Sequence, residues 1–348
     1  MFFVKSIDET IRIIQDNFSS YRTSEKEILV EDALHYVTAT DIIAKEEVPH
    51  FNRSIVDGYA VDFKSIQLAS TTTPAIVTIQ GEVLMGEKSH FSGTKTSAIY
   101  VPTGGHLPPD TNCVVMIENT EKINDELFIY KSSSMWENVL LQGSDISKES
   151  LLVQKHTTIT PLVIGALKSV GIKKIKVYEH LSATIISTGD EIVAAKDTLE
   201  IGEIRDINTF TIKNYVEANH YTVSDTVIIR DDIQGYQDSI IQGFKQSDIV
   251  ITSGGSSVGD KDYTYDVLQN IGAKILVHGV NIKPGKPTII AIYKNKLFLG
   301  LPGQPTSAYI VLLALLKHVS RTMYNLKGIE YTPYIDAVLD TNVHSVTG

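Results

Sequence analysis

The feature that most limits how this chain can fold is an alternation of strand-like and helix-like stretches in its second half. Short runs rich in β-branched residues cover 182–188, 222–229, 248–252 and 273–277, and stretches with helical spacing cover 209–218, 234–246 and 263–271. This alternation predicts a mostly parallel sheet with helices on both faces. Such sheets bind ligands beyond the carboxyl ends of their strands, so the loops there are the first candidates for a functional site.

The remaining segments predict a multidomain protein with α/β and β parts. Residues 1–45 open with an amphipathic helix capped by Ser6 and Glu9, and with 139–178 they are expected to form a helical and extended N-terminal linking domain. Residues 46–138 resemble short strands broken by Gly, Pro, Ser and Thr, which indicates a small inserted β-rich domain. Residues 179–324 hold the three-layer α/β domain, with a hairpin around Lys294-Asn295. Residues 325–348 are expected to be only the start of a C-terminal β domain, because the chain stops too soon for another core.

Charge and composition exclude several classes of function. The chain has 31 basic and 41 acidic residues, a net charge of −10, which repels nucleic acids and anionic membranes. An anionic ligand therefore needs a locally cationic pocket. The longest apolar run, 309–316, is too short to cross a bilayer, and the N-terminus lacks the features of a signal peptide. We expect a cytoplasmic protein without nucleic-acid or membrane partners.

The single cysteine and the histidines do not form a recognisable reactive or zinc site. Cys113 lies in an apolar run without a basic neighbour that would lower its thiol pKa, so a buried structural role is favoured over a nucleophilic one. The ten histidines are too scattered for a zinc-binding spacing.

Two loops that follow predicted strands are suited to bind ions. In 187–191 the adjacent carboxylates of Asp190 and Glu191 suit Mg²⁺, although a turn in which Asp190 caps the next helix explains them equally well. The loop 252–263 holds three glycines and three serines after an apolar strand, and its N–H groups and hydroxyls can cradle phosphate or another oxyanion. It matches neither the Walker A nor the GxGxxG motif, and a merely flexible loop is the alternative.

Two proline-containing loops follow. In 283–287 two prolines fix φ and Gly285 allows a tight turn, so Lys283 and Lys286 are held on a stiff backbone; solvated lysines are the alternative, which this rigidity disfavours. In 300–306 Pro305 suits the first turn of a helix, although helix initiation alone explains this loop as well. The polar loops 49–60, 102–105 and 142–145 are explained at least as well by surface turns.

Six of these motifs, taken in order, resemble the molybdopterin molybdenum-transferase family, which includes the E domain of gephyrin. They are SxxDGYA at 54–60, PTG at 102–104, STGDE at 187–191, SGGxSVGxxDY at 253–263, KPGKP at 283–287 and GLPGxP at 300–305. The resemblance spans nearly the whole chain. It implies the last step of molybdenum cofactor synthesis, in which adenylylated molybdopterin and molybdate give molybdenum cofactor and AMP in the presence of a divalent cation such as Mg²⁺.

The resemblance also implies partners and catalytic residues. It implies a homodimer whose active site joins the α/β domain of one subunit to β-domain loops of the other, with a molybdopterin adenylyltransferase as a candidate partner. The implied metal ligands are Glu191, Asp231 and Asp262, of which Glu191 and Asp231 are also catalytic. Lys283 and Lys286 are the cations that would offset the charge of molybdate. Asp57 and Asp145 are the proton donors for departing oxo ligands.

Ligand-binding residues are implied in both halves of the chain. Pterin or phosphate would be held by Ser54, Thr103, Gly189, Asp206, Ser253, Gly254, Gly255, Pro302 and Gly303. The dithiolene sulfurs of the pterin are soft donors suited to the metal, so protein thiolates are not needed. The chain departs from the family pattern at four places: Ile207 stands where Ser is common, Ser144 where Glu is common, Gln304 where Asn is usual, and 111–113 replace small residues in a structural turn.

Two other functions remain open. The α/β part also resembles molybdopterin adenylyltransferases, which share the SGG loop but usually consist of one domain, so the half that carries DGYA argues against them. The other alternative is a non-catalytic scaffold that binds pterin or protein partners, which the presence of Asp57, Glu191, Lys283 and Lys286 disfavours. Tungstate is a tetrahedral dianion of nearly the same size as molybdate, so it suits the same residues.

Overall fold

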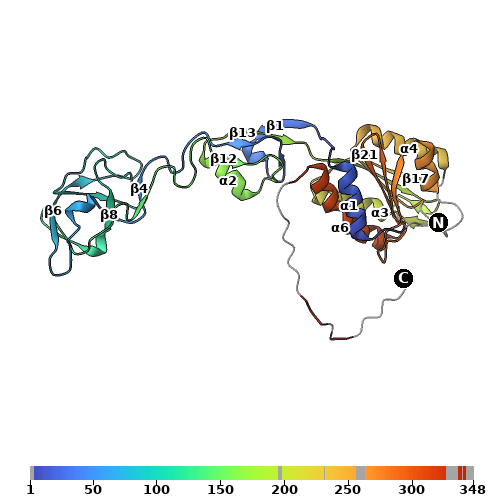
Figure 1. Ribbon diagram of the computed structural model, residues 1–348. Coiled ribbons are helices and arrows are strands. Elements are labelled where there is room, and N and C mark those ends of the chain that lie inside the picture. Colours follow the sequence, from blue (N-terminus) through green and yellow to red (C-terminus); the bar gives the residue numbers. More distant parts are fainter. Residues whose placement is uncertain are drawn as a thin grey trace.

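The structure is a computed structural model that describes residues 4–194, 198–230, 232–255, 263–326, 336–338 and 340–341. Figure 1 shows three lobes in a row: a β-rich lobe at one end, a small linking lobe in the middle and an α/β lobe at the other end. None of the described helices is long and apolar enough to cross a membrane. Because most of 325–348 lies outside the described residues, the start of a C-terminal β domain stays a prediction.

The sheet of the α/β lobe has six strands in the order β17-β14-β18-β21-β20-β19. The strands are β14 (Ser182–Thr188), β17 (Thr222–Ile229), β18 (Ile249–Ser253), β19 (Lys274–His278), β20 (Ile289–Tyr293) and β21 (Lys296–Leu301). Strands β17, β14, β18 and β21 run parallel, whereas β20 is antiparallel to both neighbours, so the sheet is mixed. The predicted hairpin is confirmed: Lys294 and Asn295 adopt φ angles of 48° and 69°, as a type I′ turn requires.

Helices cover both faces of this sheet and make three layers. The helices are α1 (Ile7–Phe18), α3 (Asn208–Ala218) and α6 (Pro305–Met323) on one face, and α4 (Ile233–Gln246) and α5 (Tyr263–Asn270) on the other. Successive residues of a strand point to opposite faces, so Ile185 of β14 is buried in the first core and Ile186 in the second. The near-continuous apolar sequence of β14 and β18 therefore results from burial on both sides.

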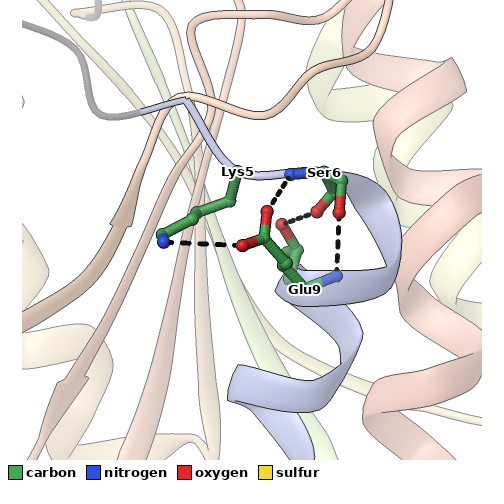
Figure 2. Close-up of polar contacts among 4 residues, drawn as sticks. Lys5, Ser6 and Glu9 are labelled. Carbon is green, nitrogen blue, oxygen red and sulfur yellow. Dashed lines mark hydrogen bonds and ion pairs between the residues drawn. The ribbon is translucent and has the colours of Figure 1, made fainter.

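The N-terminal helix α1 packs in the α/β lobe, although the sequence places residues 1–45 in the linking domain. Its apolar face buries Ile14 and Phe18 in the core that α6 also lines. The predicted capping box is present: the Ser6 hydroxyl accepts the Glu9 N–H at 3.1 Å, and the Glu9 carboxylate accepts the Ser6 N–H at 2.9 Å (Figure 2). This backbone N–H, together with nearby Lys5, lowers the pKa of Glu9.

The other two lobes are built mainly from short strands. The linking lobe contains β1 (Glu25–Leu29), β2 (Val37–Thr38), β3 (Ile42–Ile43), β12 (Leu151–Val153), α2 (Pro161–Ser169) and β13 (Lys174–Tyr178). The β-rich lobe contains a six-stranded sheet made of β5 (Gly58–Val61), β6 (Ala75–Glu82), β7 (Ser97–Val101), β8 (Cys113–Met116), β9 (Thr120–Ile123) and β10 (Glu126–Ile129), and the pair β4 (Arg53–Ser54) and β11 (Val139–Leu140) adjoins it. Cys113 is fully buried there, and burial raises the pKa of its thiol to about 12, which confirms its structural role.

Parallel pairing brings the predicted loops to one edge of the α/β sheet. The chain leaves this edge after Thr188, Ser253 and Leu301, and because β20 is antiparallel, the lysine-containing turn that precedes Ile289 lies there too. The turn after β18 requires glycine: Gly254 has a φ of 96°, and a Cβ there would lie 2.3 Å from the Thr188 carbonyl oxygen.

We expect Gly254→Ala to lower the free energy of unfolding by at least about 2 kcal/mol, because the added methyl group meets a backbone atom in a left-handed conformation. Gly272 is the matched control, since it has a φ of 78° but nothing within 4 Å of an added Cβ. Gly272→Ala should cost only about 1 kcal/mol. Urea unfolding measures both values, and equal losses would contradict the close contact at Gly254.

Three histidines meet where the linking lobe joins the α/β lobe. The rings of His35 and His220 stack with centroids 3.9 Å apart, and the ring of His180 lies 6.3 Å from that of His220 and stacks on Tyr36 at 4.0 Å. Burial lowers the pKa of His180 to about 4, and the neighbouring His220, Lys26 and His35 act in the same direction. His180 is therefore neutral in the folded protein at neutral pH.

This pKa predicts that acid destabilises the junction. The unfolded chain binds a proton at His180 near pH 6.5, whereas the folded chain does so only near pH 4, so the contribution to stability falls as the pH drops between these values. His180→Phe keeps an aromatic ring against Tyr36 without the titration. Urea unfolding at pH 7 and pH 5 should therefore show a smaller loss for His180→Phe than for wild type, and an unchanged loss for the exposed control His90→Phe. If His180→Phe loses as much stability between pH 7 and pH 5 as wild type does, this assignment is refuted.

Candidate active site

A cavity of about 370 Å³ opens at the carboxyl edge of the α/β sheet. Six predicted ligand or metal residues line it: Gly189, Glu191, Asp206, Gly254, Gly255 and Gly303. They come from the loops that follow β14, β18 and β21 and from the segment that precedes α3. The structure therefore brings together residues that span more than a hundred positions of the sequence, as the parallel topology predicts.

Three helices begin at this cavity. Their first residues, Asn208 of α3, Tyr263 of α5 and Pro305 of α6, all line it. The amides of a helix's first turn lack intrahelical acceptors, and the helix dipole makes this end positive. At α6 the preceding Gln304 forms no side-chain cap. The backbone thus provides an environment that favours a phosphate or another oxyanion.

Two buried acceptors complete the cavity. Asp206 Oδ1 accepts the Thr209 N–H at 3.1 Å, whereas Asp206 Oδ2 has no hydrogen-bond partner within the described part of the chain. Asn208 Nδ2 donates to the Gly303 carbonyl at 2.7 Å and to the Ser253 hydroxyl, and Asn208 Oδ1 likewise has no described partner. A buried polar atom without a partner costs about 1–3 kcal/mol, so both oxygens suit donor groups of a ligand.

Two predicted ligand residues lie below the cavity surface. Ser253 is 1% exposed and accepts a hydrogen bond from Asn208, so it supports the lining rather than forming it. Pro302 is also buried and does not line the cavity. Sequence reasoning, in contrast, did not select Arg205, Asn208 or Tyr263, all of which do line it. The only signal for Asn208 was its place two residues after Asp206 at a helix start.

The predicted lysines lie on the same edge but outside the cavity lining. Lys283 and Lys286 are exposed, and their turn is stiff as expected, because the Lys286 carbonyl accepts the N–H groups of Val280 at 3.0 Å and Thr288 at 2.8 Å. Gly285 packs against Val311 of α6, where a Cβ would lie 2.5 Å from that side chain. Lys283 and Lys286 therefore share the sheet edge with Glu191 but do not line its cavity.

A second cluster lies in the β-rich lobe. Asp57 Oδ1 accepts the Thr103 N–H at 2.7 Å, and the Ser54 carbonyl accepts the Gly104 N–H at 2.8 Å, so the two predicted loops are joined. Asp57 and Thr103 are exposed, whereas the Ser54 hydroxyl is buried and donates to the Val56 carbonyl. Ser54 therefore shapes its own loop.

The structure does not bring the two clusters together within one chain. Figure 1 shows the strands next to Asp57, β4 and β8, at the opposite end of the molecule from β21 and α3. Asp145, whose N–H donates to the Val48 carbonyl at 3.0 Å, is exposed in the segment that returns from the β-rich lobe. A single chain thus leaves Asp57 and Asp145 remote from Glu191.

The described residues supply only part of the predicted magnesium site. Asp231 and Asp262 lie outside them, and within the described ranges no group of three His, Cys, Asp or Glu side chains could hold a metal. Glu191 is exposed, and its carboxylate lies against Gly189, where a Cβ would be 2.9 Å from Oε2. Mg²⁺ commonly uses one or two carboxylates together with substrate phosphates, so Glu191 beside the amide-lined cavity fits a substrate-bridged ion.

Comparisons with known proteins agree with this geometry. Residues 5–171 match the family model of the MoeA N-terminal region (domain I and II), and residues 184–321 match that of a probable molybdopterin binding domain. The chain is 30% identical over 329 residues to the molybdopterin molybdenumtransferase of Haemophilus influenzae. This alignment covers 94% of this chain and 80% of the relative. It is 31% identical over 282 residues to the molybdopterin molybdenumtransferase of Staphylococcus epidermidis, and that alignment covers 81% of this chain and 67% of the relative.

A solved structure extends the similarity to the fold. The crystal structure of the molybdopterin biosynthesis MoeA protein from Pyrococcus horikosii superimposes with a TM-score of 0.76 at 32% identity and covers 92% of this chain and 80% of that one. The chain therefore belongs to the molybdopterin molybdenumtransferase family and is a transferase of molybdenum cofactor biosynthesis.

Proposed function

We propose that this protein inserts molybdate into adenylylated molybdopterin and releases molybdenum cofactor and AMP. The observation that carries the proposal is the cavity at which α3, α5 and α6 begin and which the glycine loops 254–255 and 303 line. A diphosphate that links pterin and AMP is the kind of anion that such backbone amides bind. An adenylyltransferase must supply this substrate, because its diphosphate forms when AMP is transferred to the pterin phosphate.

The reaction balances without a protein nucleophile. The two pterin thiols replace one oxo ligand of molybdate, which leaves as water with both thiol protons, and two sulfur–metal bonds form. One water molecule adds to phosphorus as the P–O–P bond breaks, which gives the pterin phosphate and AMP. Asp57 and Asp145 are the proposed carriers of the transferred protons, and both are exposed carboxylates.

Mg²⁺ is proposed as the cation that accompanies the diphosphate. Glu191 is the one proposed ligand that lies among the described residues, and Asp231 and Asp262 complete the proposed set. When bound, Mg²⁺ would neutralise charge on the phosphate that leaves with AMP. The chain's own residues orient that phosphate through the amides of Gly254 and Gly255.

We further propose that two copies of the chain form the site together. The two clusters are too remote to meet in one copy (Figure 1), and each has large apolar side chains exposed beside it. Close in sequence to Asp57 these are Phe51 and Ile55, and at the cavity or next to it in sequence they are Ile204, Ile207 and Phe210. Ile55 is 53% and Ile207 58% exposed, which supports burial of these two surfaces against each other. The β-rich lobe of one subunit would then bring Asp57 to Glu191 of the other.

Removal of either carboxylate tests the catalytic assignment. Asp57→Ala and Glu191→Ala should leave the protein folded and reduce AMP release from adenylylated molybdopterin to below about 1% of wild type, because each removes a group that acts at the reacting phosphate or oxo ligand. Chromatographic quantification of AMP is the measurement, and Glu126→Ala and Glu217→Ala remove exposed carboxylates elsewhere as controls. Pyrophosphate release from ATP and molybdopterin would instead identify an adenylyltransferase.

Mixed subunits test the shared site. Asp57→Ala and Glu191→Ala subunits that are unfolded and refolded together should regain roughly a quarter of wild-type AMP release, because half of the dimers are mixed and each of these holds one intact site. Each variant refolded alone should remain inactive. No recovery, despite mixed dimers visible by native mass spectrometry, would contradict a site that spans two subunits.

The lysine turn is tested through molybdate. Lys283→Gln and Lys286→Gln should each raise the KM for molybdate by at least about tenfold at low salt, and the difference from wild type should shrink at high ionic strength because the interaction is electrostatic. Lys274→Gln, an exposed lysine at the opposite edge of the sheet, is the control. An unchanged KM in both turn variants would remove these lysines from the site.

A further inference from the structure

The side chain of Asn208 connects three separate segments at the cavity. Asn208 is 6% exposed and is the first residue of α3. One of its amide hydrogens is directed to the Ser253 hydroxyl at the end of β18, and the other to the Gly303 carbonyl in the loop after β21. Both hydrogens of its amide group are therefore used, one for a strand end 45 positions away and one for a loop 95 positions away in the sequence.

Helix initiation does not explain this arrangement. The position before α3 is Ile207, and the N–H of Thr209 in the first turn is accepted by Asp206 rather than by Asn208. An asparagine at a helix start normally serves the helix's own N–H groups. Here its amide group donates away from the helix instead, so the residue has a different role.

Asn208 ties the end of β18, from which the loop 254–255 departs, to the loop after β21, and few other described bonds fix the spacing of these loops. The sheet ladder ends at Ser253 and Leu301, and within the described residues no backbone hydrogen bond links 254–255 to 302–304. The loops nevertheless touch, because a Cβ on Gly303 would lie 3.5 Å from the Gly254 Cα. Glycines at both places have no side chains to lock the loops, so a group that ties the strand end at Ser253 to the loop at Gly303 helps to fix their spacing.

We propose that Asn208 is a positioning residue that sets the distance between the two glycine loops and so aligns the backbone amides that receive the phosphates of the substrate. The inference rests on the proposed function for the identity of that substrate. A carboxylate cannot replace the side chain, since Asp has no donor for the Gly303 carbonyl. Asn208 itself lines the cavity, and its Oδ1 is buried without a hydrogen-bond partner among the described residues.

Hydrogen exchange of the protein without ligand tests the positioning role of Asn208 directly. Asn208→Leu removes the donors without adding charge, and Asn208→Asp removes them with nearly unchanged shape. In both variants the amides of 253–255 and 303–304 should exchange at least about tenfold faster than in wild type, because the loops open locally more often. The control is Asn214→Leu on the same helix, whose amide donates only to the Phe210 carbonyl within α3, and it should leave these loops unchanged.

Steady-state kinetics supply the readout that a purely structural role would not give. Both Asn208 variants should raise the KM for adenylylated molybdopterin at least about tenfold while kcat changes less than about threefold, because the loops bind the diphosphate before and during the reaction. Wild-type exchange in the glycine loops of Asn208→Leu would overturn the proposal, as would faster exchange throughout the α/β lobe. If wild type releases no AMP, the proposed function fails, whereas the exchange experiment still decides the role of Asn208.

Discussion

The candidate site depends on the parallel pairing of β14, β18 and β21. Their ladders align Ser187 with Ser253 and Ser253 with Leu301, so the three strands end at the same level and release their loops side by side. Both faces of β14 are buried, Ile185 in one core and Ile186 in the other, so the strands are held between two layers of helices. Every contact of the cavity, including the bonds from Asn208, is built on that alignment.

The electrostatics of the site differ from those of the chain. A net charge of −10 repels oxyanions, and the described cavity lining holds both Arg205 and the carboxylates of Glu191 and Asp206. Attraction of an anion to this cavity must therefore come largely from helix N-termini and loop amides, which need no titratable group. The lysine turn beside it offers a second, side-chain source of charge. A phosphate and a molybdate ion can thus be held by different means on one sheet edge.

Much of the fold follows from local sequence patterns, whereas the separate roles of the residues within the site do not. Apolar runs and glycine-rich loops predicted the strands, the hairpin at Lys294 and the clustering of Gly189, Glu191 and Gly254, because short-range periodicity determines those elements. The pattern did not show that α1 joins the α/β core, since an amphipathic face does not specify its partner. Nor did it show that Asn208 lines the cavity while Ser253 lies below its surface, because this depends on contacts between residues far apart in sequence.

The most direct test of the account is a crystal structure of the full chain with AMP and molybdate, with the metal located by its anomalous signal. We predict the AMP phosphate within hydrogen-bond distance of the Gly254 and Gly255 amides, and molybdate between that phosphate and the turn that carries Lys283 and Lys286. The linking lobe offers a competing groove of about 660 Å³ that is lined by Lys45, Lys148, Lys174 and Lys176. AMP in that groove, with the cavity at Gly254 vacant, would contradict the central claim.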